Sequence, residues 1–157
     1  MRILFVCTAN MARSPMAEAI FRALCTEAEI PCQVDSAGTM DYRVGQLPPP
    51  PTLAVLERHG LWTDHRARLV TREDLRVYDL VLAVDRANLE ILRAMAPPGT
   101  EGKLRLLSAF GPPGTPEDIP DPRVTGDFEG TYRLIEACCR GLLEYLRRFP
   151  AGSVAES

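Results

Sequence analysis

The sequence predicts an α/β protein in which a parallel β-sheet is covered by helices on both faces. The short apolar runs at 2–6 and 78–85 do not alternate with polar residues, which is typical of strands buried on both sides. Segments with helical periodicity separate the strand-like runs, and such alternation indicates parallel crossover connections. A chain of 157 residues fits one core, so we expect a single domain over residues 1–157.

The first strand leads directly into a helix. Ser14 and Pro15 predict the helix start, because a proline at the first helical position lacks only a hydrogen that would have no partner there. Apolar residues at i, i+3, i+4 and i+7 from Ala17 give this helix one apolar face. We therefore expect a strand, a turn and an amphipathic helix in direct succession.

The alternation of strands and helices continues to the end of the chain. Gly60 is expected to close a helix, as glycine often does. The proline-rich stretches at 48–51 and 111–122 are expected to form stiff surface connections. The remaining expected elements are strands at 32–38, 78–85 and 103–110, and helices at 52–60, 86–95 and 127–148.

Composition and charge argue against several classes of function. A net charge of -3 is unsuited to a general nucleic-acid binder, which needs a basic face. No apolar stretch approaches the ~20 residues of a membrane helix, so we expect a cytoplasmic protein that makes no membrane contact. The five cysteines include no CxxC pair and only two histidines accompany them, so neither a disulfide framework nor a metal site is predicted.

A thiol and an arginine flank the turn after the first strand. The run ILFVC ends at Cys7, and Arg13 stands immediately before the expected helix start. Ligands of open parallel sheets gather beyond the carboxyl ends of the strands, at helix N-termini. If residues 8–13 curl around one centre, their backbone N–H groups and the positive end of the helix form a cup for a tetrahedral dianion.

The same cup favours nucleophilic chemistry by the thiol. N–H donors, a helix N-terminus and a guanidinium all stabilise thiolate over thiol, so Cys7 is the expected nucleophile. Arg13 offers a planar fork of donors that binds two phosphate oxygens and stabilises charge on a phosphoryl group in transfer. Ser14 is placed to donate a hydrogen bond to the sulfur. The glycine-lysine phosphate loop of nucleotide hydrolases, GxxxxGK[ST], does not occur.

The stretch VCTANMARSPMAEAIFR resembles the signature of low-molecular-weight protein tyrosine phosphatases. The resemblance continues through DSAGT at 35–39, DHRAR at 64–68, DLVLAVDRAN at 79–88 and DPRVTGDFEGTY at 121–132. It implies a four-stranded parallel sheet with flanking helices, of the flavodoxin-like, phosphotyrosine protein phosphatase I-like type. It also implies hydrolysis of protein phosphotyrosine and aryl phosphate monoesters through a cysteinyl-phosphate, with no cofactor.

The resemblance also implies residue roles. Asp121 protonates the leaving oxygen and later helps to activate water. Asn10 holds a strained, left-handed conformation, and Asp85 is expected to pair with His65. Tyr42 is placed to stack on the substrate phenol. The expected substrate-binding residues are Thr8, Ala9, Asn10, Met11, Ala12, Ser14 and Tyr42, and the expected supporting network consists of Asn10, Ser14, Ser36, His65 and Asp85.

The expected partner is a phosphotyrosine-containing protein or peptide, with inorganic phosphate as product, and the chain is expected to be a monomer. Two alternatives share the fold. Phosphoarginine phosphatases tend to carry threonine where this chain has Met11, and arsenate reductases need further cysteines near residues 80–90, where this chain has none. Many relatives follow the Asp-Pro pair with aromatic residues, whereas Arg123 and Val124 stand here.

A third alternative belongs to a different class of function. A flavodoxin-like binding module would use the same sheet and the same anion cup to hold a flavin phosphate without chemistry. Such a module would have no use for Cys7 and Arg13 as a pair, and it would need aromatic residues flanking the flavin ring.

Overall fold

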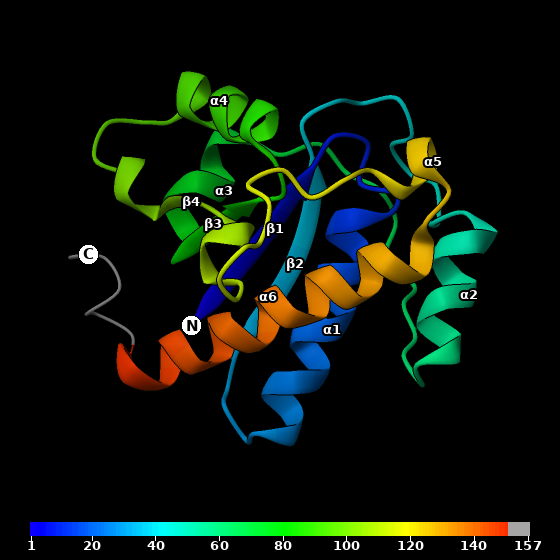
Figure 1. Cartoon of the computed structure of the whole chain (residues 1–157). Coiled ribbons are helices and arrows are strands. Elements are labelled where there is room, and N and C mark those ends of the chain that lie inside the picture. The colour runs from blue at the N-terminus through cyan, green and yellow to red at the C-terminus, as the bar shows by residue number, and fades with distance from the viewer. Residues whose placement is uncertain (151–157) are drawn as a thin grey trace.

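The computed structural model describes residues 1–150 (Figure 1). Strands and helices alternate along the chain, and two short 3-10 helices, η1 and η2, flank the last strand. The elements, in chain order, are β1 (Arg2–Cys7), α1 (Arg13–Glu27), β2 (Gln33–Gly38), α2 (Pro50–Arg58), α3 (Arg72–Val77), β3 (Leu80–Ala83), α4 (Arg86–Met95), η1 (Glu101–Lys103), β4 (Leu104–Leu106), η2 (Leu107–Phe110), α5 (Pro122–Thr125) and α6 (Phe128–Arg148).

The strands form one parallel sheet in the order β2-β1-β3-β4. β1 lies between β2 and β3, with Cys7 opposite Gly38 and Val6 opposite Ala83. Every residue of β1 after the first is buried. The expected four-stranded parallel sheet is confirmed, and it places Cys7 at the carboxyl end of a central strand.

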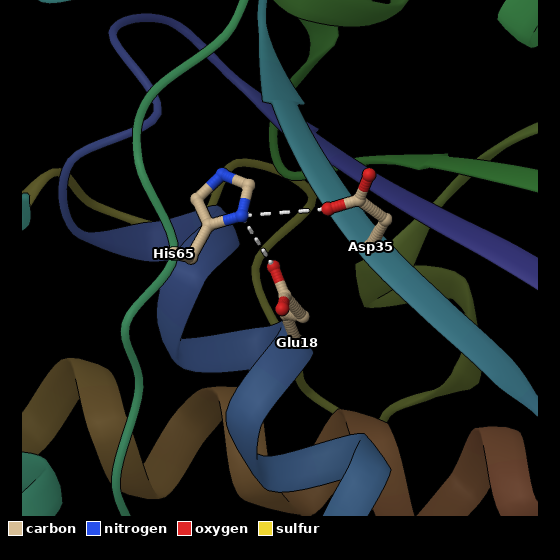
Figure 2. A group of neighbouring side chains, drawn as sticks. All are labelled: Glu18, Asp35 and His65. Carbon is tan, nitrogen blue, oxygen red and sulfur yellow. Dashed lines mark ion pairs between the residues drawn. The ribbon is translucent and has the colours of Figure 1, made fainter. Parts of the chain in front are cut away.

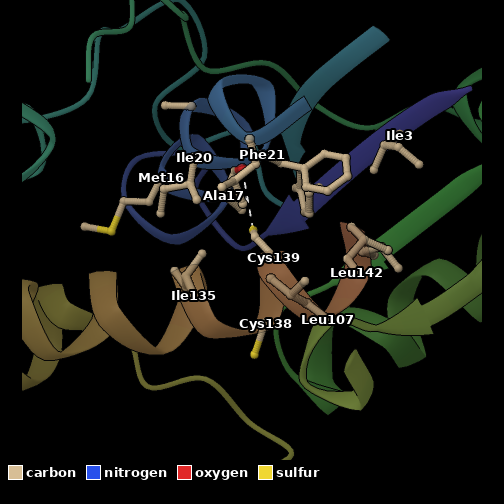
Figure 3. Close-up of a cluster of buried hydrophobic side chains, with 14 of the residues drawn as sticks. Ile3, Met16, Ala17, Ile20, Phe21, Leu107, Ile135, Cys138, Cys139 and Leu142 are labelled. Atoms are coloured by element: carbon tan, nitrogen blue, oxygen red, sulfur yellow. Dashed lines mark hydrogen bonds between the residues drawn. The ribbon is translucent and has the colours of Figure 1, made fainter. Parts of the chain in front are cut away.

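Alternate residues of β1 enter two separate hydrophobic cores. Ile3 and Phe5 pack in the core formed with α1 and α6, whereas Leu4 and Val6 pack in the core formed with α3 and α4. Figure 3 shows the first core, in which Phe21 of α1 lies close to β1. Because side chains of a strand point alternately to opposite faces, a strand with both faces covered needs apolar residues throughout.

The last helix, α6, lies along α1 on one face of the sheet (Figures 1 and 3). Its residues Cys138 and Cys139 are fully buried, and the Cys139 thiol lies 3.9 Å from the Ala17 carbonyl oxygen. These cysteines therefore serve as small core residues. Within residues 1–150, no helix has both the length and the apolar composition needed to cross a bilayer.

Two short helices were not expected from the sequence. α3 begins at a capping box in which Thr71 Oγ1 accepts from the Asp74 N–H and the Asp74 carboxylate accepts from the Thr71 N–H. This Thr-x-x-Asp spacing is a helix-start signal, but six residues are too few to show a helical period. α5 is a single turn that begins after Asp121.

Other boundaries shift for local reasons. The expected strand at 103–110 ends after three residues, and η2 takes its place. The proline run is only partly a surface connection, because α2 begins at Pro50, where a missing N–H costs no hydrogen bond. α1 begins at Arg13, one residue before the expected start. Gly60, at φ 74°, confirms the expected helix end.

A glycine in α6 marks a close approach that can be tested by substitution. A Cβ atom at Gly141 would collide with the Phe110 carbonyl oxygen of η2. We expect Gly141→Ala to lower the free energy of unfolding by about 1–3 kcal/mol, because the gain in helix propensity does not offset the overpacking. Urea denaturation measures this change. The exposed neighbour Arg140→Ala is the control, with an expected change below about 0.5 kcal/mol. An unchanged Gly141→Ala midpoint would contradict close packing of α6 on η2.

Candidate active site

The turn after β1 lines a cavity of about 180 Å³ at the carboxyl edge of the sheet. Larger hollows lie between α1 and α6, about 380 Å³, and beside α4, about 630 Å³, but no cysteine lines either of them. Three segments that are distant in sequence meet at the smaller cavity. Its lining residues are Cys7, Thr8, Ala9, Met11, Ala12, Arg13, Tyr42, Asp121 and Arg123.

α1 begins at this cavity without a side-chain cap. Its N-cap residue is Ala12, which has no side-chain acceptor, and its first turn contains no acidic residue. By contrast, a side chain accepts from first-turn N–H groups at the starts of four other helices, where the N-cap residues are Thr71, Asp85, Asp121 and Asp127. α2 also has no side-chain cap, but its first two residues are prolines, which have no N–H. The N–H groups and the positive end of the α1 dipole are therefore available to an anion.

The backbone of the loop at 8–13 packs closely against its neighbours. Asn10 has φ 58°, which confirms the expected left-handed conformation, one that is rare for residues other than glycine. A Cβ atom at Gly38 of β2 would lie 2.6 Å from the Thr8 carbonyl oxygen, so this position requires glycine. From α2, Thr52 Oγ1 donates to the Met11 carbonyl at 3.2 Å. The loop is thus held from both sides.

Ser14 connects the cysteine to the supporting network. Its Oγ lies 2.9 Å from Cys7 Sγ and accepts a hydrogen bond from Asn10 Nδ2 at 2.8 Å. The other acceptor near the hydroxyl, the Ala37 carbonyl, is farther away at 3.4 Å. Because the Asn10 amide already donates to the serine oxygen, the serine proton can be donated to the Cys7 sulfur or to the Ala37 carbonyl oxygen.

Arg13 is buried, and one end of its guanidinium is anchored. Nη1 donates to Asp85 Oδ2 at 2.7 Å and to the Ile119 carbonyl at 2.9 Å. Within residues 1–150, the polar contacts of Nη2 are long, 3.5 Å to Thr8 Oγ1 and 3.9 Å to Asp121 Oδ2. The side chain therefore lines the cavity as a fixed cation, and Nη2 retains capacity for an anionic ligand.

Asp121 reaches the cavity from the proline-rich segment. Its Oδ1 accepts from the Arg123 N–H at 3.0 Å, and its Oδ2 is the atom that lies nearest Arg13. The approach to this residue is fixed to the sheet, because the Ile119 N–H donates to the Val84 carbonyl at 3.0 Å, directly after β3. A carboxyl held in this way is placed to transfer a proton inside the cavity.

His65 connects the loop to Glu18 of α1 and Asp35 of β2, and Figure 2 shows these three side chains facing one another. Its Nε2 lies 2.7 Å from Asn10 Oδ1, and its Nδ1 lies 3.2 Å from Glu18 Oε1 and 3.4 Å from Asp35 Oδ1. Ser36 Oγ accepts from Asn10 Nδ2 at 3.0 Å and donates to Glu18 Oε1 at 2.7 Å. Each polar atom of the Asn10 side chain therefore has a partner, which stabilises the left-handed residue.

Asp85 does not belong to this network, and its expected pairing with His65 is wrong. Asp85 instead binds Arg13 and accepts from the Asn88 N–H at 2.8 Å as the N-cap of α4. The sheet order explains the difference, because Asp85 follows β3 on one side of β1, whereas His65 contacts β2 on the other.

The group in Figure 2 also has the composition of a metal site. In the described part of the chain, Glu18, Asp35 and His65 bring three potential ligand atoms within 4.8 Å of one another. However, Glu18 Oε2 pairs with Arg22 at 2.5 Å, and Asp35 Oδ2 pairs with Arg68 at 3.1 Å. Arginine already neutralises both carboxylates, so we assign the group to support of the loop.

The remaining cysteines lie in different surroundings. Burial raises the pKa of the Cys138 thiol to about 11 and that of Cys139 well above its usual value. A hydrogen bond between Cys25 and Cys32 raises the pKa of the first thiol and lowers that of the second. Cys32 immediately precedes β2, at the amino edge of the sheet, whereas Cys7 lies at the carboxyl edge beside a helix N-terminus.

Most of the predicted substrate-binding residues meet in the cavity. Asn10 and Ser14 are exceptions, because their side chains form the network behind the loop. Glu18 and Asp35 were not predicted, since only the tertiary structure brings them to His65. The predicted substrate-binding residues that line the cavity are Thr8, Ala9, Met11, Ala12 and Tyr42.

Comparison with known proteins gives a consistent family assignment. Residues 2–150 match the family model described as low molecular weight phosphotyrosine protein phosphatase. A low molecular weight protein-tyrosine-phosphatase from Streptomyces coelicolor is 40% identical over 161 aligned residues, which cover 98% of each chain.

Solved structures show the same similarity in three dimensions. YfkJ from Bacillus subtilis, named a low molecular weight protein-tyrosine-phosphatase, has a TM-score of 0.89 and 35% identity, covering 94% of this chain and 95% of its own. Drosophila arginine phosphatase has a TM-score of 0.88 and 34% identity, covering 94% of this chain and 98% of its own. This chain therefore belongs to the low molecular weight phosphotyrosine protein phosphatase family.

Proposed function

We propose that this protein hydrolyses phosphotyrosine in proteins and peptides, and other aryl phosphate monoesters, through a cysteinyl-phosphate intermediate. The observation that carries the proposal is the meeting of Cys7, Arg13 and Asp121 in one cavity, at the start of a helix with no side-chain cap. Phosphoryl transfer from an aryl ester needs a nucleophile, an anion clamp and a proton donor. Family membership supports the same reaction class.

In the first step, Cys7 attacks phosphorus in line with the leaving oxygen. The sulfur–phosphorus bond forms as the bond from phosphorus to the phenolic oxygen breaks. The other phosphate oxygens bind the N–H groups of residues 8–13 and the anchored Arg13, which stabilise the charge in the transition state. A dianion bound beside Asp121 favours the protonated carboxyl, which gives its proton to the departing oxygen.

In the second step, water hydrolyses the cysteinyl-phosphate. Asp121, now a carboxylate, accepts a proton from the water as its oxygen bonds to phosphorus. Cys7 leaves as a thiolate, stabilised by the Ser14 hydroxyl at 2.9 Å. The products are inorganic phosphate and the free enzyme, and the scheme uses no metal ion or cofactor.

Two residues of the cavity favour an aromatic substrate. Met11 lines the cavity with an apolar side chain, and Tyr42 leaves 68% of its surface exposed, so that its ring can stack on a phenol. The alternative substrate is protein phosphoarginine, which is favoured by the similarity to Drosophila arginine phosphatase.

Three matched peptides distinguish these substrates. We expect the phosphotyrosine peptide to give a higher kcat/KM than phosphoserine or phosphoarginine peptides of the same sequence, because its aromatic ring packs best on Met11 and the Tyr42 ring. Phosphate release is measured with EDTA present. A higher kcat/KM for phosphoarginine would replace the proposal with its alternative, and loss of activity in EDTA would contradict the metal-free scheme.

Removing the nucleophile separates chemistry from binding. We expect Cys7→Ser to lower turnover by more than about 10³-fold, because a serine hydroxyl here is a far weaker nucleophile. Phosphate binding, measured by calorimetry, should persist because the N–H groups and Arg13 remain. Cys32→Ser is the matched control, because the hydrogen bond with Cys25 lowers the pKa of this thiol, yet Cys32 lies at the amino edge of the sheet, away from the cavity. If Cys32→Ser abolished turnover while Cys7→Ser kept it, the assignment would be wrong.

The proton donor can be identified from leaving-group dependence. We expect Asp121→Ala to slow phenyl phosphate by about 10²-fold or more, and p-nitrophenyl phosphate by much less, because nitrophenolate departs without a proton. The matched control is Asp118→Ala, in the same segment, whose carboxylate pairs with Arg86 at 2.9 Å. Equal slowing of both substrates by Asp121→Ala would count against its role as the acid.

A further inference from the structure

We infer that Arg123 selects phosphotyrosine substrates that carry an acidic residue beside the phosphotyrosine, an inference that rests on the proposed function. Arg123 lines the active-site cavity together with Tyr42. When the aryl phosphate occupies the cavity, the guanidinium is placed to meet the carboxylate of a glutamate or aspartate next to it in the substrate chain. Arg123 would thus bind substrate outside the reacting centre.

The two arginines of the cavity lie at different depths. Arg13 is 5% exposed and reaches into the cavity from the start of α1, whereas Arg123 is an exposed residue of α5. The backbone of Arg123 is fixed, because its N–H donates to Asp121 Oδ1 at 3.0 Å. When the phosphate binds at Arg13, the residues that flank the phosphotyrosine therefore remain near the cavity mouth, where Arg123 lies.

Arg123 is also available for a ligand. Some of the other exposed arginines pair with carboxylates, as Arg86 does with Asp118 at 2.9 Å and Arg93 with Glu90 at 2.7 Å. Within residues 1–150, no ion pair of 4.0 Å or less involves Arg123. An arginine without an intramolecular partner at the rim of a binding cavity has its full set of donors free for a carboxylate.

The surroundings of Arg123 favour an anionic partner. The Asp121 carboxylate accepts from the α5 backbone and lies near Arg13, so it does not neutralise Arg123. The next residue, Val124, is 84% exposed and uncharged. Because a substrate carboxylate would meet Arg123 near solvent, the preference it confers is modest, up to about fivefold.

The test uses two phosphotyrosine peptides that differ only in charge. One carries glutamate on both sides of the phosphotyrosine and the other carries glutamine, and kcat/KM is measured for each. We expect an acidic-to-neutral ratio of about 2 to 5 for the wild-type enzyme, about 1 for Arg123→Ala and below 1 for Arg123→Glu. The change should appear in KM rather than kcat, because the contact is the same in the ground and transition states.

A distant arginine provides the matched control. Arg148 is another exposed arginine, at the far end of α6, and the 21 residues of this helix span about 30 Å. Arg148→Glu makes the same change of net charge as Arg123→Glu, so it should leave the ratio at its wild-type value. Each ratio is taken within one variant, which cancels any loss of folded or active enzyme.

The outcomes separate this inference from the proposed function. A wild-type ratio of 1, or a ratio above 1 that survives in Arg123→Glu, would overturn the role of Arg123 while phosphotyrosine hydrolysis stands. An equal loss of the ratio in Arg148→Glu would also overturn it, since net charge alone would then explain the preference. Failure of the wild-type enzyme to cleave either peptide would overturn the proposed function and this inference with it.

Discussion

The proposed active site depends on the start of α1, where no side chain caps the first-turn N–H groups. Ala12 supplies no cap, whereas four other helices begin at a threonine or aspartate whose side chain accepts from the first turn. Because buried donors without acceptors cost free energy, an anion bound at this helix start would stabilise the folded protein. Cys7 and Arg13 stand at the two ends of the loop that surrounds these donors. The apolar face of α1 holds the core together, so the element that stabilises the fold also positions the chemistry.

The loop needs support because its geometry is strained. Asn10 lies in the left-handed region, and both ends of its amide are held by Ser14, Ser36 and His65. On the other side of β1, Asp85 anchors Arg13. The β2 side of β1 therefore supports the loop backbone, and the β3 side supports the Arg13 guanidinium. The fixed geometry lets the site bind a phosphoryl group without reorganising during the reaction.

The sequence predicts the elements with strong local signals. The parallel sheet and the helix over 86–95 follow from apolar runs and helical periodicity, and the succession of Cys7, the turn and Arg13 at a helix start can be read from the chain itself. What sequence reasoning missed depends on tertiary packing. The partner of Asp85 is decided by strand order, and α3 and α5 are too short to show a period. The carboxylates around His65 come from segments whose proximity no local pattern encodes.

The most direct test of the central claim is a search for phosphate on Cys7 during turnover. The enzyme is mixed with an aryl phosphate, denatured within milliseconds and digested, and the cysteine-containing peptides are analysed by mass spectrometry. A covalent mechanism at this site predicts a phosphoryl group on the peptide that contains Cys7 and on no other cysteine. Active enzyme whose Cys7 stays unmodified throughout the burst, or a phosphoryl group found instead on Cys32, would contradict it.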